Sequence, residues 1–212
     1  MASVSCYCSL VLMALALASA PMAAVAGDPD ILTDFVAPTM LGEPANITGD
    51  YFTFTSFRGY TMPVAAFAAT KASMVEFPAL NGQSVSYARL VFPPGTVNPP
   101  HTHPRAAELL LVVDGALSVG FIDTAGKLYT QDLTIGDMFV FPKGLVHYQN
   151  NKGAGPAVAL SAFGSAAPGI VSVPVTVFGT GVDDTVLAKS FKTDVPTVQK
   201  LKTALTPPPK KP

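Results

Sequence analysis

The chain has 212 residues, of which 49% are hydrophobic and 13% are charged, and its formal net charge is −1. This length accommodates one domain with a substantial core. No basic patch is present, and no aromatic residues are interleaved with Lys or Arg, which argues against nucleic-acid binding. The low charge content instead suits a chain that hides much of its surface in an oligomer.

The first 26 residues have the pattern of a secretory signal peptide. Leu10–Ala20 is almost wholly apolar, and Ala24-Val25-Ala26 is a small-x-small cleavage site, although no basic residue precedes the apolar run. The run is shorter than the roughly 20 residues that a membrane-spanning helix needs, which argues against a membrane anchor. We therefore expect residues 1–26 to be removed and the mature chain to be secreted.

The mature chain, 212 minus 26 or about 186 residues, would contain no cysteine, because Cys6 and Cys8 both lie in the signal peptide. Packing and oligomer contacts, not disulfides, would then hold its N-terminal segment. Asn46-Ile-Thr48 is an N-glycosylation acceptor in a stretch rich in Gly and Pro. Because a secreted chain meets the glycosylation machinery, we expect Asn46 to carry a glycan.

Short apolar segments dominate the middle of the chain. From Gly59 to Gly82 no clear period emerges, so this part is expected to be mostly loop. The segments that follow are separated by turn signals such as Pro-Pro-Gly, Asp-Gly and Pro-Lys-Gly, a spacing typical of a β-sandwich or barrel. The predicted strands are Ser86–Phe92, Glu108–Val113, Leu117–Ile122, Leu128–Leu133, Met138–Phe141, Val146–Asn150, Ala157–Phe163 and Ile170–Val177.

After Gly181 the pattern becomes helical. Asp183-Asp184-Thr185 is a capping sequence before a short apolar segment, and further apolar residues follow Pro196 at helical spacing. Two short amphipathic helices are therefore expected near the end of the chain. The last six residues, 207–212, read Pro-Pro-Pro-Lys-Lys-Pro and are expected to form a disordered or polyproline II tail.

All three histidines of the chain fall in two short stretches of the strand-rich region. His101 and His103 are two residues apart, so on an extended strand both point to one face. Glu108 opens the next apolar run, which we expect to pair back against the histidine strand. His147 follows 39 residues after Glu108 and can reach the other three if the sheet closes into a small barrel.

Three imidazoles and one carboxylate suit a divalent transition metal, and without a thiolate Mn, Fe, Ni, Cu and Zn all remain open. Four protein ligands leave two octahedral positions free. This arrangement is catalytic more than structural, because structural zinc sites are usually closed and tetrahedral. A His-x-His pair alone is a weak indication, but an acid beside an apolar strand and the clustering of all three histidines strengthen it.

The two stretches resemble the two cupin motifs, G-x5-HxH-x4-E-x6-G from Gly95 and G-x5-PxG-x2-H-x3-N from Gly136, at every fixed position. Four segments are similar to plant germin-like proteins in particular, and together with the motifs they extend the resemblance over nearly all of the mature chain. They are Asp28-Pro-Asp, Pro99-Pro-His-Thr-His-Pro-Arg-Ala, Pro142-Lys-Gly-Leu-Val-His and Pro168-Gly-Ile-Val-Ser-Val-Pro.

The resemblance implies an all-β fold, a single cupin β-barrel or jelly roll over residues 27–206, with short C-terminal α-helices. It implies Mn²⁺ as the metal, with water at the open positions. The C-terminal helices would clasp a neighbouring subunit, so that three dimers form a homohexamer. It further implies a place in the apoplast and superoxide dismutase-type activity, which generates hydrogen peroxide in plant defence or cell-wall processes.

Two alternatives stay open. True germins oxidise oxalate and hold this dianion with two pocket asparagines, of which one matches Asn98 while the other falls on Ala88, which donates no hydrogen bond. Asn98 is equally well explained as a turn residue before Pro99 and Pro100. Other cupins are storage or extracellular binding proteins without activity. An intact set of four ligands argues against storage but leaves a binding protein open.

Overall fold

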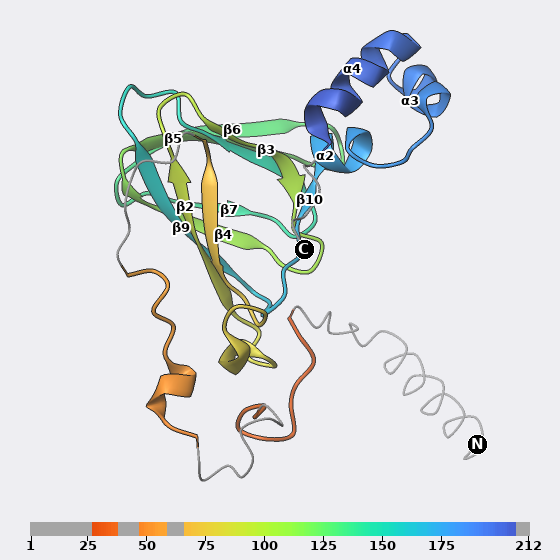
Figure 1. The fold of residues 1–212 in the computed structure, drawn as a ribbon. Coiled ribbons are helices and arrows are strands. Elements are labelled where there is room, and N and C mark those ends of the chain that lie inside the picture. Colours follow the sequence, from red (N-terminus) through yellow and green to blue (C-terminus); the bar gives the residue numbers. More distant parts are fainter. Residues whose placement is uncertain (1–26, 38–46, 59–65, 207–212) are drawn as a thin grey trace, which may run out of the picture.

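The structure, a computed structural model, describes residues 27–37, 47–58 and 66–206 (Figure 1). Two antiparallel five-stranded sheets form a jelly-roll barrel, in the orders β1-β2-β9-β4-β7 and β10-β3-β8-β5-β6. The all-β prediction is therefore confirmed. The predicted signal peptide, the acceptor Asn46 and the tail 207–212 lie outside the described residues. The strands are β1 Ala68–Ala72, β2 Ser86–Phe92, β3 Val97–Thr102, β4 Glu108–Asp114, β5 Ala116–Ile122, β6 Leu128–Thr134, β7 Met138–Phe141, β8 Val146–Asn150, β9 Ala157–Phe163 and β10 Val171–Ser172.

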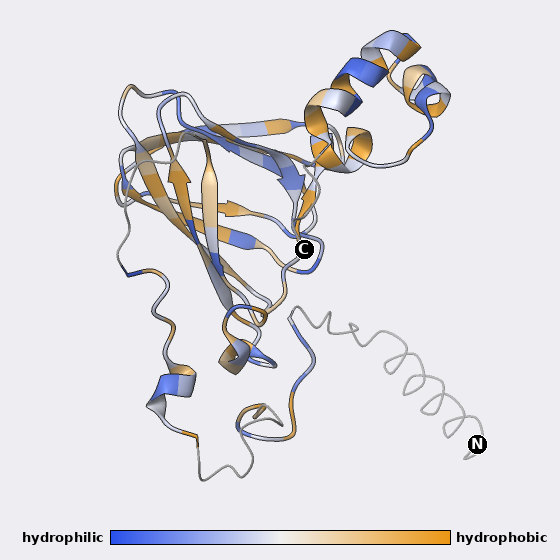
Figure 2. Cartoon of the chain, in the orientation of Figure 1, coloured by the Kyte–Doolittle hydropathy of each residue, from blue (hydrophilic) through white to orange (hydrophobic). Residues whose placement is uncertain are grey.

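The core lies between the two sheets and follows from the alternation of side chains along each strand. In β4, Glu108, Leu110 and Val112 are buried whereas Leu109 and Val113 are exposed. Figure 2 shows the hydrophobic residues concentrated along the strands of the barrel. Burial of each large apolar side chain stabilises the fold by about 1.5–3 kcal/mol. The larger core residues are Leu90, Phe92, Leu110, Val112, Leu117, Val119, Leu133, Phe141 and Phe163.

The expected pairing of the Glu108 strand with the histidine strand is wrong. β4 lies between β9 and β7 in one sheet, whereas β3 lies between β10 and β8 in the other. Glu108 still meets the histidines, because the two sheets face each other and its side chain is on the inward face of β4. The acid and the imidazoles therefore approach one another across the barrel and not along one sheet.

Strand β3 contains a bulge that decides which of its residues face inward. Asn98 pairs with Gln149 and His101 with His147, so three steps along β3 match two steps along β8. Pro99 and Pro100 occupy the extra length, where the absence of N–H donors favours an interruption of the ladder. Three residues apart in a regular strand, Asn98 and His101 would face opposite ways, whereas here both are buried.

Two predicted segments differ from the structure. Strand β1 lies in the stretch expected to be loop. Of the predicted strand Ile170–Val177, only β10 is extended, and helix α2 (Val173–Phe178) follows directly. Pro174 lies in the first turn of this helix, where its fixed φ is favourable and no intrahelical donor is lost. Among the described residues there are also two short 3-10 helices, Gly49–Phe52 and Pro78–Leu80.

The two predicted C-terminal helices are confirmed as α3 (Asp184–Ser190) and α4 (Val195–Leu205). Asp183 caps α3 by accepting from the backbone N–H groups of the first turn, and Asp194 does the same for α4. With α2 the helices form a small cluster of their own, beyond the barrel core (Figure 1). Its buried members are Phe178, Leu187, Ala188 and Val198.

Candidate metal centre

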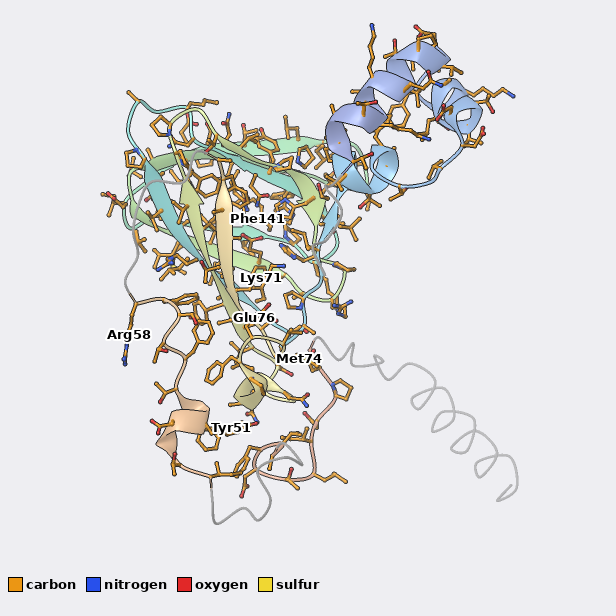
Figure 3. All side chains as sticks on the ribbon, viewed as in Figure 1. Tyr51, Arg58, Lys71, Met74, Glu76 and Phe141 are labelled. Atoms are coloured by element: carbon orange, nitrogen blue, oxygen red, sulfur yellow. The ribbon has the colours of Figure 1, made fainter. Side chains whose placement is uncertain are left out.

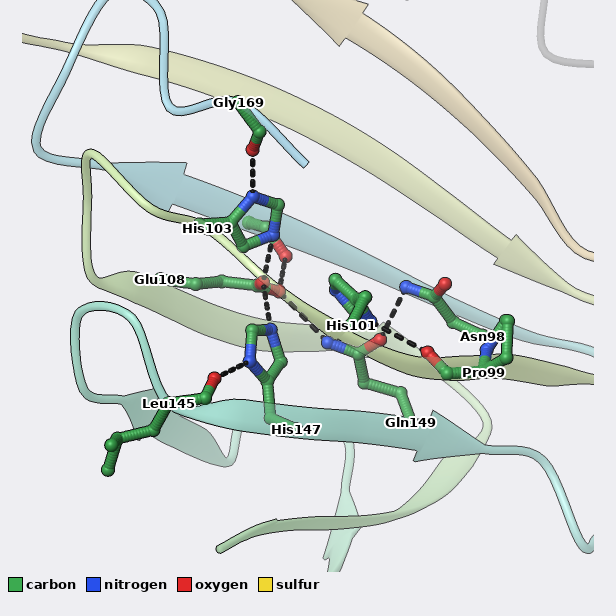
Figure 4. Close-up of polar contacts among 10 residues, drawn as sticks. Asn98, Pro99, His101, His103, Glu108, Leu145, His147, Gln149 and Gly169 are labelled. Atoms are coloured by element: carbon green, nitrogen blue, oxygen red, sulfur yellow. Dashed lines mark hydrogen bonds and ion pairs between the residues drawn. The ribbon is translucent and has the colours of Figure 1, made fainter. Parts of the chain in front are cut away.

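The four residues predicted to bind a metal come together between the two sheets (Figure 4). His101 lies in β3, His103 directly after it, Glu108 at the start of β4 and His147 in β8. One potential ligand atom of each lies within 4.8 Å of those of the others, and all four residues are buried. The bulge in β3 and the facing of the sheets thus produce the cluster that motif spacing predicted.

Backbone carbonyls orient all three imidazole rings. Nδ1 of His101 lies 2.8 Å from the carbonyl oxygen of Pro99, and Nδ1 of His147 lies 2.9 Å from that of Leu145. Nδ1 of His103 lies 2.5 Å from the carbonyl oxygen of Gly169. Because a carbonyl only accepts, each Nδ1 carries the proton and each neutral ring is left with a lone pair on Nε2. A metal requires this tautomer from all three rings.

The carboxylate of Glu108 is held from one side only. Its Oε1 accepts from the hydroxyl of Ser161 at 2.6 Å and from Nε2 of Gln149 at 3.1 Å. Its Oε2 faces Nε2 of His103 and Nε2 of His147, each at 3.1 Å. Ser161 and Gln149 therefore fix the carboxylate so that Oε2 is presented to the histidines as a ligand atom.

The donor set fits a cation. With Nδ1–H committed to a carbonyl, Nε2 of His103 and Nε2 of His147 are acceptors that face another acceptor, Oε2 of Glu108. Such contacts are repulsive unless a cation, or an extra proton on each ring, lies between the atoms. A divalent ion satisfies all of these lone pairs at once, and the nitrogen and oxygen ligands suit a borderline transition metal.

Burial decides how these groups titrate. Burial lowers the pKa of His101 to about 4, and the neighbouring imidazole of His147 acts in the same direction, so the His101 ring stays neutral over the physiological range. Burial alone would raise the pKa of Glu108, but its contacts with the imidazoles of His103 and His147 outweigh burial and lower that pKa to about 2. A neutral imidazole and an ionised carboxylate are the forms that bind metal.

Asn98, the predicted pocket residue, is buried beside the centre and is linked to it. Its Nδ2 donates to Oε1 of Gln149 at 2.7 Å, and Gln149 in turn donates to Glu108. Motif spacing did not single out Gln149 or Ser161. A signal for Gln149 was available, because it lies two residues after His147 on the same strand and so shares its face. Ser161, in β9, carried no comparable signal.

A cavity of about 260 Å³ connects the centre to the surface. His101, His103, Glu108, Asn98 and Ala88 are among the residues that line it, and Ala88 contributes only a methyl group. Apolar side chains form most of the remaining wall. The outer part is lined by two exposed cations, Lys71 and Arg105, and by Glu76; Lys71 and Glu76 are labelled in Figure 3.

None of the helices in the described part of the chain is long and apolar enough to cross a membrane. Among the described residues, the three histidines and Glu108 are the group of potential ligands that could hold a metal ion.

Comparison with known proteins agrees with the motifs. Residues 62–199 match the cupin family. Germin-like protein 9-3 of Oryza sativa subsp. japonica is 70% identical over 210 residues, which cover 95% of this chain and 97% of the relative. Germin-like protein 9-1 of the same species is 55% identical over 195 residues, or 90% of this chain and 78% of the relative.

The fold has similar solved structures. An oxalate oxidase superimposes with a TM-score of 0.77 at 35% identity, covering 84% of this chain and 98% of its own. An oxalate oxidase in complex with the substrate analogue glycolate gives the same TM-score, identity and coverage. Two cupin motifs, a jelly-roll barrel, a buried cluster of three histidines and one glutamate, and close relatives over nearly the full length together show that this chain belongs to the plant germin-like proteins of the cupin family.

Proposed function

We propose that the chain is a secreted, manganese-dependent enzyme of the superoxide dismutase type that releases hydrogen peroxide in the plant apoplast. The observation that carries this proposal is a buried cluster of three histidines and one glutamate at the inner end of a cavity that reaches the surface. A bound manganese ion supplies one-electron chemistry by cycling between the +2 and +3 states. Two superoxide ions and two protons give one dioxygen and one hydrogen peroxide.

The protein's own groups prepare the site for this small anion. Three carbonyl-locked rings and the clamped carboxylate hold the ligand atoms ready, so little rearrangement is needed on binding. Exposed Lys71 and Arg105 line the outer part of the cavity and give it positive potential, partly offset by Glu76. Such a field raises the encounter rate of an anion.

Oxalate oxidation is the second candidate, favoured by the similarity to solved oxalate oxidases and by the position of Asn98 in the cavity. Oxalate is a dianion, and holding it away from water requires several donors. One N–H of Asn98 is already engaged with Gln149, and Ala88 offers none. The cavity is therefore better suited to superoxide, which needs no second amide.

We further propose that the protein assembles as a homohexamer, a trimer of dimers. The outer face of the β4–β7 pair is apolar: Leu109, Val113, Met138 and Val140 are between 39% and 55% exposed. A contiguous apolar face of this kind is unfavourable in water and typical of an interface. Val186, Phe191 and Leu201 add exposed apolar side chains on the C-terminal helices.

Elemental analysis of the secreted protein, followed by superoxide and oxalate assays on the same sample, tests the function. We expect manganese bound at the centre and superoxide dismutase activity that is lost after chelation and regained on reloading. A His101→Gln variant controls for dismutation by loosely bound manganese. Stable protein without metal, or with metal but without peroxide production, would instead support an extracellular binding protein.

A further inference from the structure

The loop of residues 165–169, here called the Ser165–Gly169 loop, belongs both to the cavity wall and to the metal centre. Ala167, Pro168 and Gly169 line the cavity. The carbonyl of Gly169 accepts from Nδ1 of His103 and so determines which nitrogen of that ring is free to bind metal (Figure 4). Any displacement of this loop therefore changes the orientation of a predicted ligand.

Arg105 holds the C-terminal half of the loop. Its Nε donates to the carbonyl of Ala167, and its backbone N–H donates to the carbonyl of Pro168 at 3.2 Å. The guanidinium lies against Gly169, where a Cβ would come within 2.9 Å of Nη2. Gly169 also has a φ of +69°, a backbone conformation that favours glycine over residues with a side chain.

Asp28, which is 137 residues before Ser165 in the sequence, holds the N-terminal half of the Ser165–Gly169 loop. Its Oδ1 accepts from the hydroxyl of Ser165 at 2.5 Å, and its Oδ2 accepts from the backbone N–H of Ala166 at 2.6 Å. The backbone N–H of Asp28 is itself anchored, donating to Ser84 at 3.0 Å. Ser165 is fully buried. The carboxylate thus satisfies both a buried hydroxyl and a backbone donor of the loop.

We propose that Asp28 is a positioning residue for the metal centre, acting through the Ser165–Gly169 loop on His103. This positioning role rests on the proposed function in one respect only: the centre must bind a metal. Without the carboxylate, the Ser165 hydroxyl and the Ala166 N–H lose their acceptor, and the loop keeps only its contacts with Arg105, Ser86 and Met74. This role also links two segments that the ligand set leaves unexplained, because Asp28 of Asp28-Pro-Asp contacts the loop that leads into Pro168-Gly-Ile. Removal of residues 1–26 would leave Asp28 as the second residue of the chain.

The test compares Asp28→Ala, Asp28→Asn and Ser165→Ala with wild type, each expressed as the full-length chain and secreted. Asp30→Ala, at an exposed position two residues away, is the matched control. After loading with Mn²⁺, the rate of metal loss to excess chelator and the zero-field splitting in the Mn²⁺ EPR spectrum are measured. Removing a direct partner of a ligand costs about 10–100-fold in metal affinity, and Asp28 acts one step further out, so we expect loss to be about three- to tenfold faster.

The spectroscopic readout separates positioning from general stabilisation. Asp28→Ala is expected to change the EPR splitting, and Asp28→Asn to change it less. The Asp28→Ala/Ser165→Ala double variant is expected to be affected less than the sum of the two single variants, because both remove the hydrogen bond between Asp28 and Ser165. If Asp28→Ala does not accumulate, Asp28→Asn and Ser165→Ala carry the comparison. Metal loss and EPR spectra equal to those of Asp30→Ala would overturn the proposal, even with a lower melting temperature. Wild type that binds no Mn²⁺ would overturn the proposed function as well.

Discussion

The side-chain amide of Gln149 donates a hydrogen bond to the carboxylate of Glu108, with 3.1 Å between Nε2 and Oε1. The carboxylate can only accept, so the opposite end of the amide, Oε1, is turned toward Asn98 and accepts from it at 2.7 Å. One side chain therefore couples a predicted metal ligand to the wall of the cavity.

Gln149→Leu keeps the size of this side chain but removes both contacts. We expect Mn²⁺ affinity to fall by about 10–100-fold, the usual cost of losing a hydrogen-bond partner of a ligand. Competition with a chelator of known affinity, followed by metal analysis, measures the change. Gln131→Leu, on the exposed strand β6, is the matched control. Equal affinities in the two variants would show that Ser161 alone holds the carboxylate.

His103→Ala removes a ligand and is expected to lower metal content severely and to abolish redox activity, while secretion can survive. The reason is that the three remaining ligands, His101, Glu108 and His147, would leave the ion incompletely enclosed. Elemental analysis of the secreted variant provides the measurement. Full manganese occupancy in this variant would show that His103 is not a ligand.

Acid is expected to destabilise the metal-free protein. The pKa of His101 is lowered from 6.5 to about 4, chiefly by burial, so between these values the unfolded chain binds a proton that the folded chain does not. Burial acts to raise the pKa of Glu108, but its contacts with His103 and His147 outweigh burial and lower that pKa from 4.5 to about 2. In both windows the unfolded state binds more protons, so stability falls as pH falls.

Urea unfolding at several pH values between 7 and 4 measures the upper of these windows. His101→Gln, which cannot titrate, should flatten the pH dependence between about 6.5 and 4, whereas wild type loses stability there. The same competition from protons should release metal in acid, since imidazole binds only when neutral. A pH dependence unchanged by His101→Gln would contradict the assignment of this window to His101.

Ala88→Asn tests the choice between superoxide and oxalate. The substitution adds a donor to the cavity wall, and a hydrogen bond to a charged group contributes roughly 1.5–3 kcal/mol, or about ten- to a hundredfold or more in a rate or affinity. Oxalate turnover should therefore rise more than superoxide turnover, if the barrel tolerates the larger side chain. Parallel assays on manganese-loaded protein measure both. Brisk oxalate-dependent peroxide production by the unmodified chain, without superoxide activity, would defeat the proposal.

Truncation at Gly181 tests the proposed assembly. It removes α3 and α4 and exposes Phe178, which packs in the helical cluster with Leu187 and Val198. We expect monomers or aggregates in analytical ultracentrifugation, because the exposed apolar surface loses its partner. Truncation after Thr206, which removes the tail 207–212 alone, is the control. A chain cut at Gly181 that still sediments as the intact oligomer would contradict the proposal.

Local sequence signals predicted much of the fold, because apolar segments between turn residues define a strand without reference to its partners. The bounds of β2, β7, β8 and β9 agree with the prediction. β1 was missed because Ala-Ala-Thr-Lys-Ala has no clear alternation. Helix α2 was taken for strand because its run of β-branched residues favours extended backbone, whereas Pro174 in the first turn and Gly179 at the end favour a helix.

The cluster of potential ligands was predicted correctly because its spacing follows two known motifs, but its surroundings were not. The pairing of β4 with β9 and β7 depends on contacts far apart in the chain, and the expected hairpin with β3 was the simpler choice. Ser161 and Gly169 approach the centre only through this long-range arrangement. The two prolines, Pro99 and Pro100, are a visible cause of the bulge. That the bulge turns Asn98 inward could not be predicted, because it depends on the register with strand β8.

The carbonyls that orient the three rings belong to Pro99, Leu145 and Gly169, and none of them uses a side chain for this purpose. Mutation can therefore alter neighbouring side chains during evolution without disturbing ring orientation, provided that the path of the backbone is kept. Wall positions such as Ala88 are free to change under selection for a new substrate. A lineage with this barrel can diversify its chemistry while inheriting the same centre.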